Sequence, residues 1–210
     1  MSVTLRHENG IVTEVHSSQQ RAPWTTCPGA IAQLEKSFKG FPLARIPGGA
    51  QKRINCTHLY DLALLGAAHA LDAEPFIYDV LVSDPINAER QIELRRNGAP
   101  VLQWTEKDGV MSAPAELVGL SVYTMSAWVA SQRAEHREYA RLLSWAARVA
   151  LGRFFQQDEV LDPTTLPLSC FTFQPGVVEH AGRAMQARDF SAGDASPLDG
   201  RFVGGKISAK

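Results

Sequence analysis

Residues 90–105 read RQIELRRNGAPVLQWT, and this stretch indicates what kind of fold the chain adopts. Two runs within it, 90–96 and 100–105, alternate apolar and polar residues on either side of Asn97-Gly98. Alternation with a period of two predicts strands, and Asn-Gly between two such runs predicts a tight hairpin turn. Residues 76–83 are rich in aromatic and β-branched residues and predict one more strand. We therefore expect an antiparallel sheet in the middle of the chain.

The N-terminal third predicts another hairpin and two helices. Residues 2–16 hold two alternating runs around an Asn-Gly pair, which again predicts a hairpin. Apolar residues at helical spacing predict a helix over residues 30–38. Asn55 and Thr57 are favourable N-capping residues, so we expect the next helix to start at one of them and to end near Leu71.

The C-terminal half predicts one long helix followed by irregular chain. From about Ala115 to Phe155 apolar residues recur at helical spacing, with a break expected near Gly119. From Asp158 onward prolines and glycines interrupt any regular pattern, and beyond Ser191 the residues are mostly small and polar. Such a segment is typical of an arm wrapped on a core or of a disordered tail.

Strands and helices are segregated along the chain rather than alternating, which predicts an α+β fold. We expect an antiparallel sheet built from hairpins and packed against helices, with a long C-terminal helix and an irregular tail. Three parts follow from this pattern. They are an α+β core over residues 1–112, a long helix over 113–157 that packs on the core or on a partner subunit, and an irregular arm or tail over 158–210.

Composition narrows the class of protein. The 210 residues are 45% hydrophobic and 20% charged with a net charge of −1, which is ordinary for a globular chain with one sizeable core. No basic block favours nucleic acid or an anionic membrane surface, and no apolar run is long enough to span a bilayer. The N-terminus does not resemble a signal peptide, so we expect a cytoplasmic protein. Three widely spaced cysteines without a Cys-x-x-Cys pair predict free thiols rather than a structural zinc site.

Two short stretches resemble one bacterial family. Residues 27–30 read Cys-Pro-Gly-Ala, and residues 55–62 read Asn-Cys-Thr-His-Leu-Tyr-Asp-Leu. These motifs resemble those of domain of unknown function (DUF) 2889, and the resemblance covers roughly residues 3–106. The family usually has Gly where this chain has Asn55, and the long helix and tail lie outside the resemblance. What the resemblance implies is a role in bacterial catabolism of plant-derived aromatic compounds, such as lignin degradation.

His58 and Asp61 are the strongest candidates for chemistry. They lie three residues apart, which places them on the same face of a helix. His58 falls in the first helical turn, where the helix dipole disfavours the imidazolium form. A neutral imidazole held by a carboxylate is a usable general base. The alternative is structural, with His58 bonded to a loop and Asp61 complementing the helix dipole.

Further candidates surround this pair or lie on the predicted long helix. Tyr60 and Tyr78 are phenols that could bind or deprotonate an acidic hydroxyl, although either could simply pack. Three polar residues continue the apolar face of the long helix, where they would line a pocket or a subunit interface: Gln132, His136 and Tyr139. Cys56 precedes a helix N-terminus and is either a nucleophile or a buried, inert thiol.

The motifs that the sequence lacks shift the prediction toward side-chain acid–base chemistry. It has no Gly-rich phosphate loop, no Gly-x-Ser-x-Gly elbow and no His-Glu-x-x-His. Together with the His58–Asp61 pair, these absences lead us to expect a cofactor-independent lyase. The resemblance implies that its substrate is a small phenolic molecule, such as a lignin-derived dimer that releases formaldehyde. His58 would be the base and Asp61 its orienting partner, Tyr60 would assist, and the substrate contacts would be Tyr78, Gln132, His136 and Tyr139.

Two other classes of function stay open. One is a metal-dependent hydrolase that uses His58, Asp61 and a distant third ligand. The other is a non-catalytic binding or assembly protein, a homodimer joined through the long helix with His136 and Tyr139 at its seam. The first hypothesis expects no cofactor and no metal, and all three leave the exact substrate open.

Overall fold

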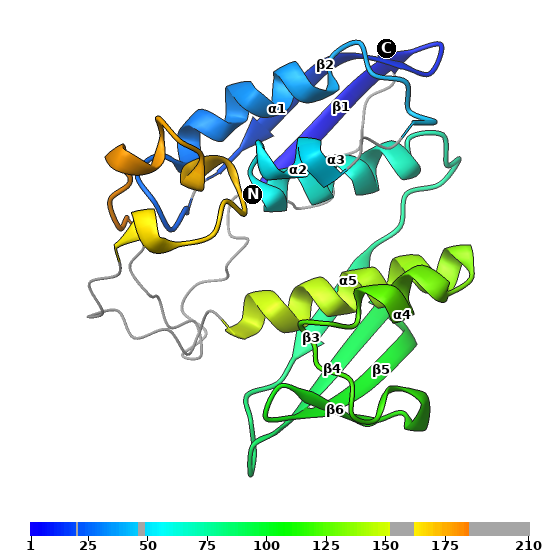
Figure 1. Cartoon of the computed structure of the whole chain (residues 1–210). Coiled ribbons are helices and arrows are strands. Elements are labelled where there is room, and N and C mark those ends of the chain that lie inside the picture. Colours follow the sequence, from blue (N-terminus) through cyan, green and yellow to red (C-terminus); the bar gives the residue numbers. More distant parts are fainter. Residues whose placement is uncertain (20, 46–48, 152–161, 185–210) are drawn as a thin grey trace, which may run out of the picture. The chain divides into compact units, whose positions relative to one another are not determined.

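The computed structural model describes residues 1–19, 21–45, 49–151 and 162–184, and these form two compact units (Figure 1). Unit 1 contains the described residues up to Leu71 together with 162–184, and unit 2 contains those from Asp72 to Leu151. Both units combine helices with antiparallel strands, so the predicted α+β class is confirmed. The division falls near residue 72 and not at residue 112 as the sequence suggested.

Unit 1 is a two-stranded hairpin covered by helices. Asn9 and Gly10 both have positive φ, 50° and 77°, which explains why Asn-Gly occupies this tight turn. Helix α1 packs on strand β2 and helix α3 packs on strand β1. The elements are β1 (Ser2–Glu8), β2 (Ile11–Ser18), η1 (Cys27–Gly29), α1 (Ala30–Phe38), α2 (Gly49–Arg53) and α3 (Thr57–Ala68).

The core of unit 1 follows from the apolar spacing of these elements. Leu34 and Phe38 lie one turn apart on α1 and are fully buried, as the helical pattern predicts. Leu59 and Tyr60 meet them from α3, and the Tyr60 ring packs against Phe38 with the ring centroids 5.2 Å apart. Helix α3 ends at Ala68, about one turn before the predicted Leu71.

Residues 162–184 form an irregular arm that returns to unit 1. Its short 3-10 turns are η4 (Pro163–Thr165), η5 (Phe171–Phe173) and η6 (Val178–His180). Trp24 meets the Phe173 ring edge-on at 5.6 Å, and the Arg183 guanidinium lies over the Trp24 ring. The N–H of Phe171 donates to the Asn55 carbonyl at 2.9 Å. The other parts of the predicted arm or tail, 158–161 and 185–210, lie outside the described residues.

Unit 2 is a four-stranded antiparallel sheet with a helix across one face. The strands follow in chain order, β3 (Tyr78–Val82), β4 (Glu89–Arg96), β5 (Ala99–Lys107) and β6 (Val110–Ala113). Asn97 and Gly98 form the predicted turn between β4 and β5, with φ of 51° and 80°. Ile92 and Leu94 of β4 and Trp104 of β5 share one buried core with helix α5, since alternate strand residues face the helix.

The long helix predicted from about Ala115 to Phe155 is not confirmed, although the break expected near Gly119 is present. Its predicted end, 152–155, lies outside the described residues. Residues 118–122 instead return beside β6, where the Met111 N–H donates to the Leu120 carbonyl at 2.8 Å and the Gly119 N–H donates to the Met111 carbonyl at 3.0 Å. Gly119 has a left-handed φ of 87°, which interrupts a helix. Backbone pairing with the sheet therefore overrides the helical spacing. The helical elements are η2 (Ala115–Leu117), α4 (Ser126–Ser131) and α5 (Ala134–Ala150).

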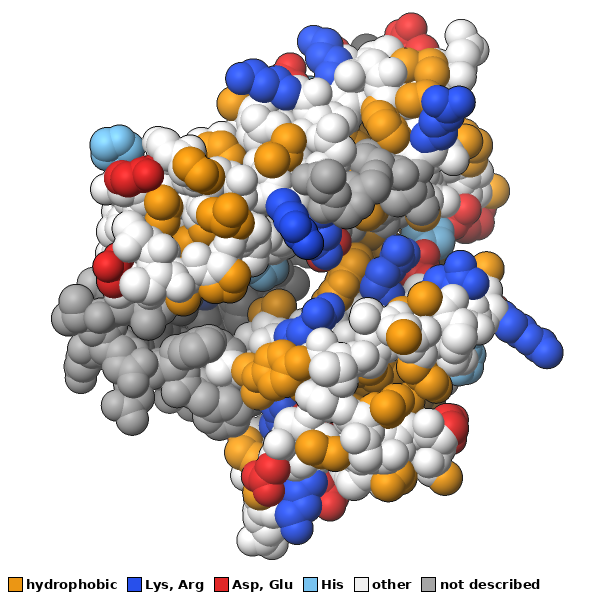
Figure 2. Space-filling view, in the orientation of Figure 1, with side chains coloured by type: hydrophobic (Ala, Val, Ile, Leu, Met, Phe, Trp, Pro, Cys, Tyr) orange, Lys and Arg blue, Asp and Glu red, His pale blue; other side chains and the backbone are white. Residues whose placement is uncertain are grey.

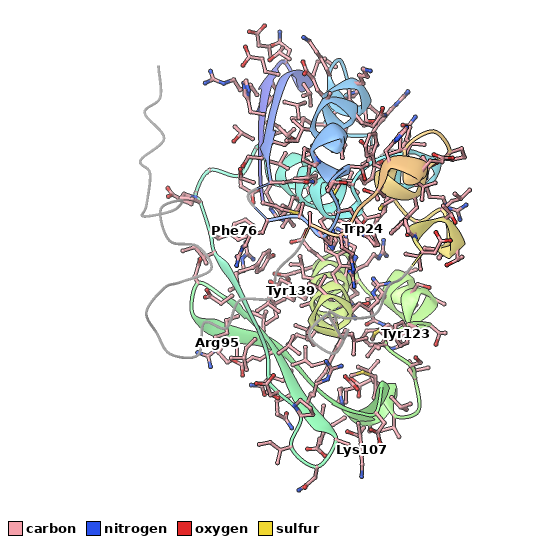
Figure 3. All side chains as sticks on the ribbon, turned by 90° about the vertical axis from the view of Figure 1, so that its left-hand side faces the viewer. Trp24, Phe76, Arg95, Lys107, Tyr123 and Tyr139 are labelled. Atoms are coloured by element: carbon pink, nitrogen blue, oxygen red, sulfur yellow. The ribbon has the colours of Figure 1, made fainter. Side chains whose placement is uncertain are left out.

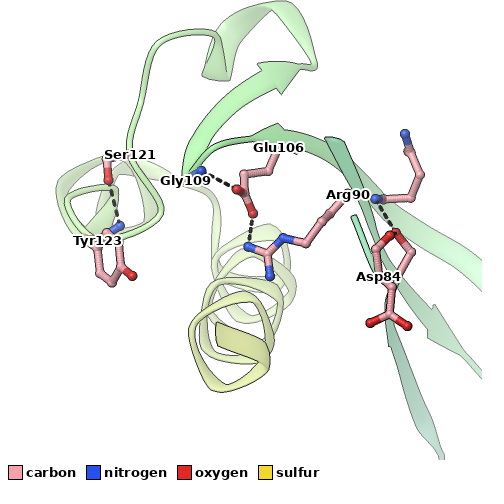
Figure 4. A network of polar contacts seen from close by, with 8 residues as sticks. Asp84, Arg90, Glu106, Gly109, Ser121 and Tyr123 are labelled. Carbon is pink, nitrogen blue, oxygen red and sulfur yellow. Dashed lines mark hydrogen bonds and ion pairs between the residues drawn. The ribbon is translucent and has the colours of Figure 1, made fainter. Parts of the chain in front are cut away.

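A buried ion pair ties β4 to β5 (Figure 4). Arg90 and Glu106 are cross-strand partners, and each side chain is only 3% exposed. The Arg90 guanidinium donates to one carboxylate oxygen of Glu106, and the Gly109 N–H donates to the other. A charge this deeply buried requires an ion partner and further hydrogen bonds, and Glu106 has both.

The face drawn in Figure 2 carries side chains of several kinds. On the face that Figure 2 shows, basic, acidic and hydrophobic side chains are interspersed among uncharged ones. Among the helices of the described residues, none combines the length and the apolar character needed to cross a bilayer.

Candidate functional site

His58 lies in the first turn of α3. The sequence predicted that this helix starts at Asn55 or Thr57. The helix begins at Thr57 with Cys56 as its N-cap, and the backbone of Cys56 is extended there. The His58 residue is exposed, yet burial by surrounding protein atoms lowers the pKa of its imidazole. The Asp61 carboxylate raises that pKa and the Lys52 ammonium lowers it, both less strongly than burial. His58 is therefore a mainly neutral imidazole that solvent can reach.

Asp61 has a different partner from the predicted one. The Lys52 ammonium, supplied by α2, lies 2.6 and 2.7 Å from the two carboxylate oxygens of Asp61. The Lys52 side chain is 34% exposed and that of Asp61 is 14% exposed, so the pair is partly withdrawn from water. Within the described residues no hydrogen bond joins His58 to Asp61, which acts on the imidazole through its charge. Lys52 was missed in the sequence because it lies before the helix, on a separate element.

Asn55 is fully buried and holds the approach to α3 in place. Its amide nitrogen donates to the Ser37 hydroxyl at 2.8 Å and to the Gln51 carbonyl at 2.7 Å. Its side chain thus joins α1, α2 and the start of α3 and does not cap the helix, which starts at Thr57, the other of the two predicted positions. A buried amide with these partners orients the neighbouring segment that carries Lys52 and His58.

Tyr60 points into the core of unit 1. It is 1% exposed, and burial together with the charge of Asp61 raises the pKa of its hydroxyl to about 12. A phenol in this state stays protonated at neutral pH. The predicted catalytic role of Tyr60 is untested, and its surroundings favour packing against Phe38.

Two of the predicted substrate contacts, Tyr78 and Tyr139, do meet in unit 2. Their ring centroids are 5.9 Å apart, and Figure 3 labels Tyr139 on α5 and Phe76, whose ring centroid lies 4.9 Å from that of Tyr78. Tyr78 donates its hydroxyl to Glu138 at 2.7 Å, and Tyr139 donates to Glu135 at 2.6 Å. Burial, strengthened by these carboxylates, raises the pKa of both phenols. Neither ring is therefore prepared to act as a base.

The other two predicted contacts, His136 and Gln132, have different settings. His136 is exposed, and its ring lies 6.5 Å from that of Tyr139. Gln132 ends α4, where its amide donates to the Trp128 carbonyl at 3.1 Å. The backbone carbonyl of Gln132 accepts a hydrogen bond from the Arg137 guanidinium at 2.7 Å, so Gln132 stabilises the junction between α4 and α5.

The predicted site residues thus divide between the two units. The first group, in unit 1, contains His58, Asp61 and Tyr60, and the second, in unit 2, contains Tyr78, Gln132, His136 and Tyr139. Each group is a local arrangement on its own unit. Among the described residues, no three His, Cys, Asp or Glu side chains come together in a way that could hold a metal ion.

The Cys-Pro-Gly motif has a structural use that the sequence did not reveal. A Cβ atom on Gly29 would lie 3.0 Å from the Phe171 ring, so a larger residue would require the ring to shift. The hydroxyl of Thr172 lies 3.2 Å from that of Thr26 and 3.5 Å from the Cys27 sulfur. The signal was the glycine itself, but its partner lies over a hundred residues away in sequence.

Comparison with known protein families, with curated proteins and with solved structures finds no match to this chain. The resemblance to domain of unknown function 2889 stays a prediction.

Proposed function

We propose that the chain is a cofactor-independent lyase in which His58 acts as general base on a small phenolic substrate. One observation carries the proposal. A solvent-accessible imidazole with a lowered pKa lies next to the Lys52–Asp61 ion pair, whose distances are 2.6 and 2.7 Å. A neutral base beside a fixed cation is the combination needed to remove a hydroxyl proton and stabilise a developing oxyanion.

The proposed reaction releases formaldehyde from a phenolic dimer. The substrate carries a hydroxymethyl group on one carbon and an aryloxy group on the next. His58 takes the hydroxyl proton, and the O–H electron pair forms the C=O bond of formaldehyde. The C–C bond breaks, its electron pair forms a C=C bond, and the aryloxy group leaves as an aryl oxide. Lys52 stabilises that oxide until solvent protonates it, so the reaction is redox-neutral and needs no cofactor.

Each residue of this group then has a distinct role. His58 is the catalytic base, and Lys52 is the cation that faces the departing oxygen. Asp61 is a positioning residue, because it holds the ammonium and its charge partly restores the basicity of the imidazole. The predicted substrate contacts Tyr78, Gln132, His136 and Tyr139 belong to unit 2, and this mechanism does not use them.

The test is formaldehyde release from a panel of such dimers by the full chain. Removing a general base typically lowers the rate by about 10²–10⁴-fold, so His58→Gln should lose at least about 100-fold in kcat. His16→Gln is the matched control, because His16 is an exposed histidine of the same unit, with a side chain 66% exposed. Full turnover in His58→Gln, or no formaldehyde from any member of the panel, would overturn the proposal.

A second pair of variants separates the cation from the base. Lys52→Arg keeps a positive charge beside Asp61, whereas Lys52→Met removes it. We expect Lys52→Met to lower kcat more than Lys52→Arg does, because the developing oxide loses its counter-charge. Equal rates in the two variants would remove Lys52 from the mechanism. Binding of the dimers without any product would instead indicate a non-catalytic binding protein.

A further inference from the structure

All three cysteines of the chain gather in unit 1, although they are far apart in sequence. Cys27 lies at the start of η1, Cys56 caps α3, and Cys170 precedes η5 in the arm. All are free thiols; Cys27 and Cys56 are buried and Cys170 is partly exposed. The Cys27 sulfur lies 3.5 Å from the Thr172 hydroxyl, which places the arm beside this cluster.

A backbone hydrogen bond brings Cys56 and Cys170 near each other. The hydrogen bond from the Phe171 N–H to the Asn55 carbonyl, 2.9 Å long, joins the residue after Cys170 to the residue before Cys56. With standard bond lengths, this bond limits the two Cα atoms to within about 8 Å. The hydrogen-bonded path is bent at the oxygen and at the nitrogen, so the two Cα atoms lie closer still. A disulfide spans Cα–Cα separations of up to roughly 7 Å.

The arm is fixed in this position from more than one side. The Gln174 amide donates both to the Arg53 carbonyl at 3.0 Å and to the Cys170 carbonyl at 3.1 Å. The Phe171 ring fills the space above Gly29. The backbone of Cys170 and of the residues after it is therefore held beside the segment that leads to Cys56.

We propose that Cys56 and Cys170 form a redox modification site, at which a hydroperoxide joins the two thiols in a disulfide that ties the arm to the start of α3. Cys170, the more exposed of the two, reacts first. Its thiolate attacks one peroxide oxygen, the O–O bond breaks, and a sulfenic acid and hydroxide form. The Cys56 thiolate then attacks the Cys170 sulfur and expels a second hydroxide. The two thiols lose two electrons, and hydrogen peroxide with the two thiol protons yields two waters.

The Cys56 and Cys170 thiols stay mostly protonated, and therefore slow to oxidise, at neutral pH. Burial raises the pKa of Cys56 and of Cys170, in each case against weaker lowering by nearby backbone N–H groups. The thiolate is the reacting form. The oxidation is therefore best followed at mildly alkaline pH, about 8.5, where more of each thiol is ionised.

The experiment uses the reduced full chain, hydrogen peroxide as the probe and mass spectrometry as the readout. Remaining thiols are alkylated, and the protein is digested with trypsin without reduction. Lysines and arginines between the three cysteines place each on its own tryptic peptide. We expect the intact chain to lose about 2 Da, the mass of two hydrogen atoms, and the peptides of Cys56 and Cys170 to be linked until dithiothreitol is added.

Matched cysteine variants identify the pair. Cys27→Ala should retain the link, whereas Cys170→Ser should abolish it. Cys170 is the least buried of the three, so this variant tests the proposal even if substitution of Cys56 impairs folding. Three results would overturn the proposal. They are a disulfide that joins mainly Cys27 to Cys56 or to Cys170, disulfides only between separate chains, and oxidation to sulfinic acid without any disulfide.

Discussion

His58 has an imidazole that is accessible to solvent but unfavourable to protonate. Burial by neighbouring atoms and the Lys52 ammonium both lower its pKa, and Asp61 only partly opposes them. The helix N-terminus adds to this, since its dipole repels positive charge. A neutral imidazole in the first turn was predictable from the position of His58 alone. The Lys52 contribution was not, because it depends on how α2 meets α3.

The lowered pKa of His58 predicts how stability depends on pH. Below its ordinary value of 6.5 the unfolded chain binds a proton at this ring more readily than the folded protein does. The contribution of His58 to the free energy of unfolding is thus fully present above pH 6.5 and is lost as the pH falls through the folded-state pKa. We expect His58→Gln to flatten the increase in unfolding free energy between about pH 5 and pH 7.

Urea denaturation at several pH values measures that slope. The His16→Gln variant shows how much of any change comes simply from losing a titratable ring in the same unit. A slope in His58→Gln as steep as in the parent protein would show that His58 is not held neutral by the fold.

At the scale of elements, replacing two different glycines by alanine should have opposite effects on stability. Gly29→Ala places a Cβ 3.0 Å from the Phe171 ring, so the arm must shift, and we expect a loss of about 1–3 kcal/mol. Gly66 lies inside α3, where a Cβ would meet only Leu5 at 3.9 Å. Gly66→Ala should therefore stabilise the protein by about 0.4–1 kcal/mol, because alanine lowers the entropy of the unfolded chain.

Urea unfolding of the two alanine variants is the measurement. Each variant is the control for the other, because both replace a glycine by alanine. Destabilisation of equal size in both variants would contradict the close packing of the arm on Gly29.

The Arg90–Glu106 pair makes a prediction for unit 2. Glu106→Leu leaves the Arg90 guanidinium without its counter-charge in the sheet, and we expect it to cost about 3–5 kcal/mol. The double variant Arg90→Met/Glu106→Leu removes both charges and should recover most of that loss. Thermal and urea unfolding of Glu106→Leu, of Arg90→Met and of the double variant measure the coupling. An additive double variant would contradict a stabilising buried pair.

The elements could be predicted wherever the signal is local. Both Asn-Gly turns and the 30–38 helix follow from neighbouring residues, because left-handed backbone and apolar spacing are encoded within a few positions. The helix predicted from residue 115 begins only at α4, because residues 118–122 pair with β6, a contact that helical spacing does not reveal. The same limit hid the match between Gly29 and Phe171.

At the scale of the whole molecule, unit 2 is inserted between two parts of unit 1. Its helices α4 and α5 and its four strands come from one continuous segment, whereas unit 1 needs both the first 71 residues and the arm. Sequence patterns mark elements but not which of them share a core, so the boundary near residue 72 was not predictable. The assignment of seven candidate site residues to two units has the same origin.

Continuity of unit 2 predicts that it folds alone. A fragment of residues 72–159 contains the complete core around Leu94, Trp104 and Leu143, and we expect it to unfold cooperatively in urea. A fragment of residues 1–71 lacks the arm and should be less stable than unit 1 in the full chain. Near-ultraviolet circular dichroism of both fragments is the measurement, and an unfolded 72–159 fragment would contradict the division.

The titration of the His58 ring by NMR tests most directly whether this chain carries a neutral base beside a cation. We predict that His58 in the full chain titrates below 6.5. In Lys52→Met its pKa should rise, because the ammonium is lost and the Asp61 carboxylate is no longer neutralised by it. A His58 that titrates at or above 6.5, or that is unaffected by Lys52→Met, would contradict the account.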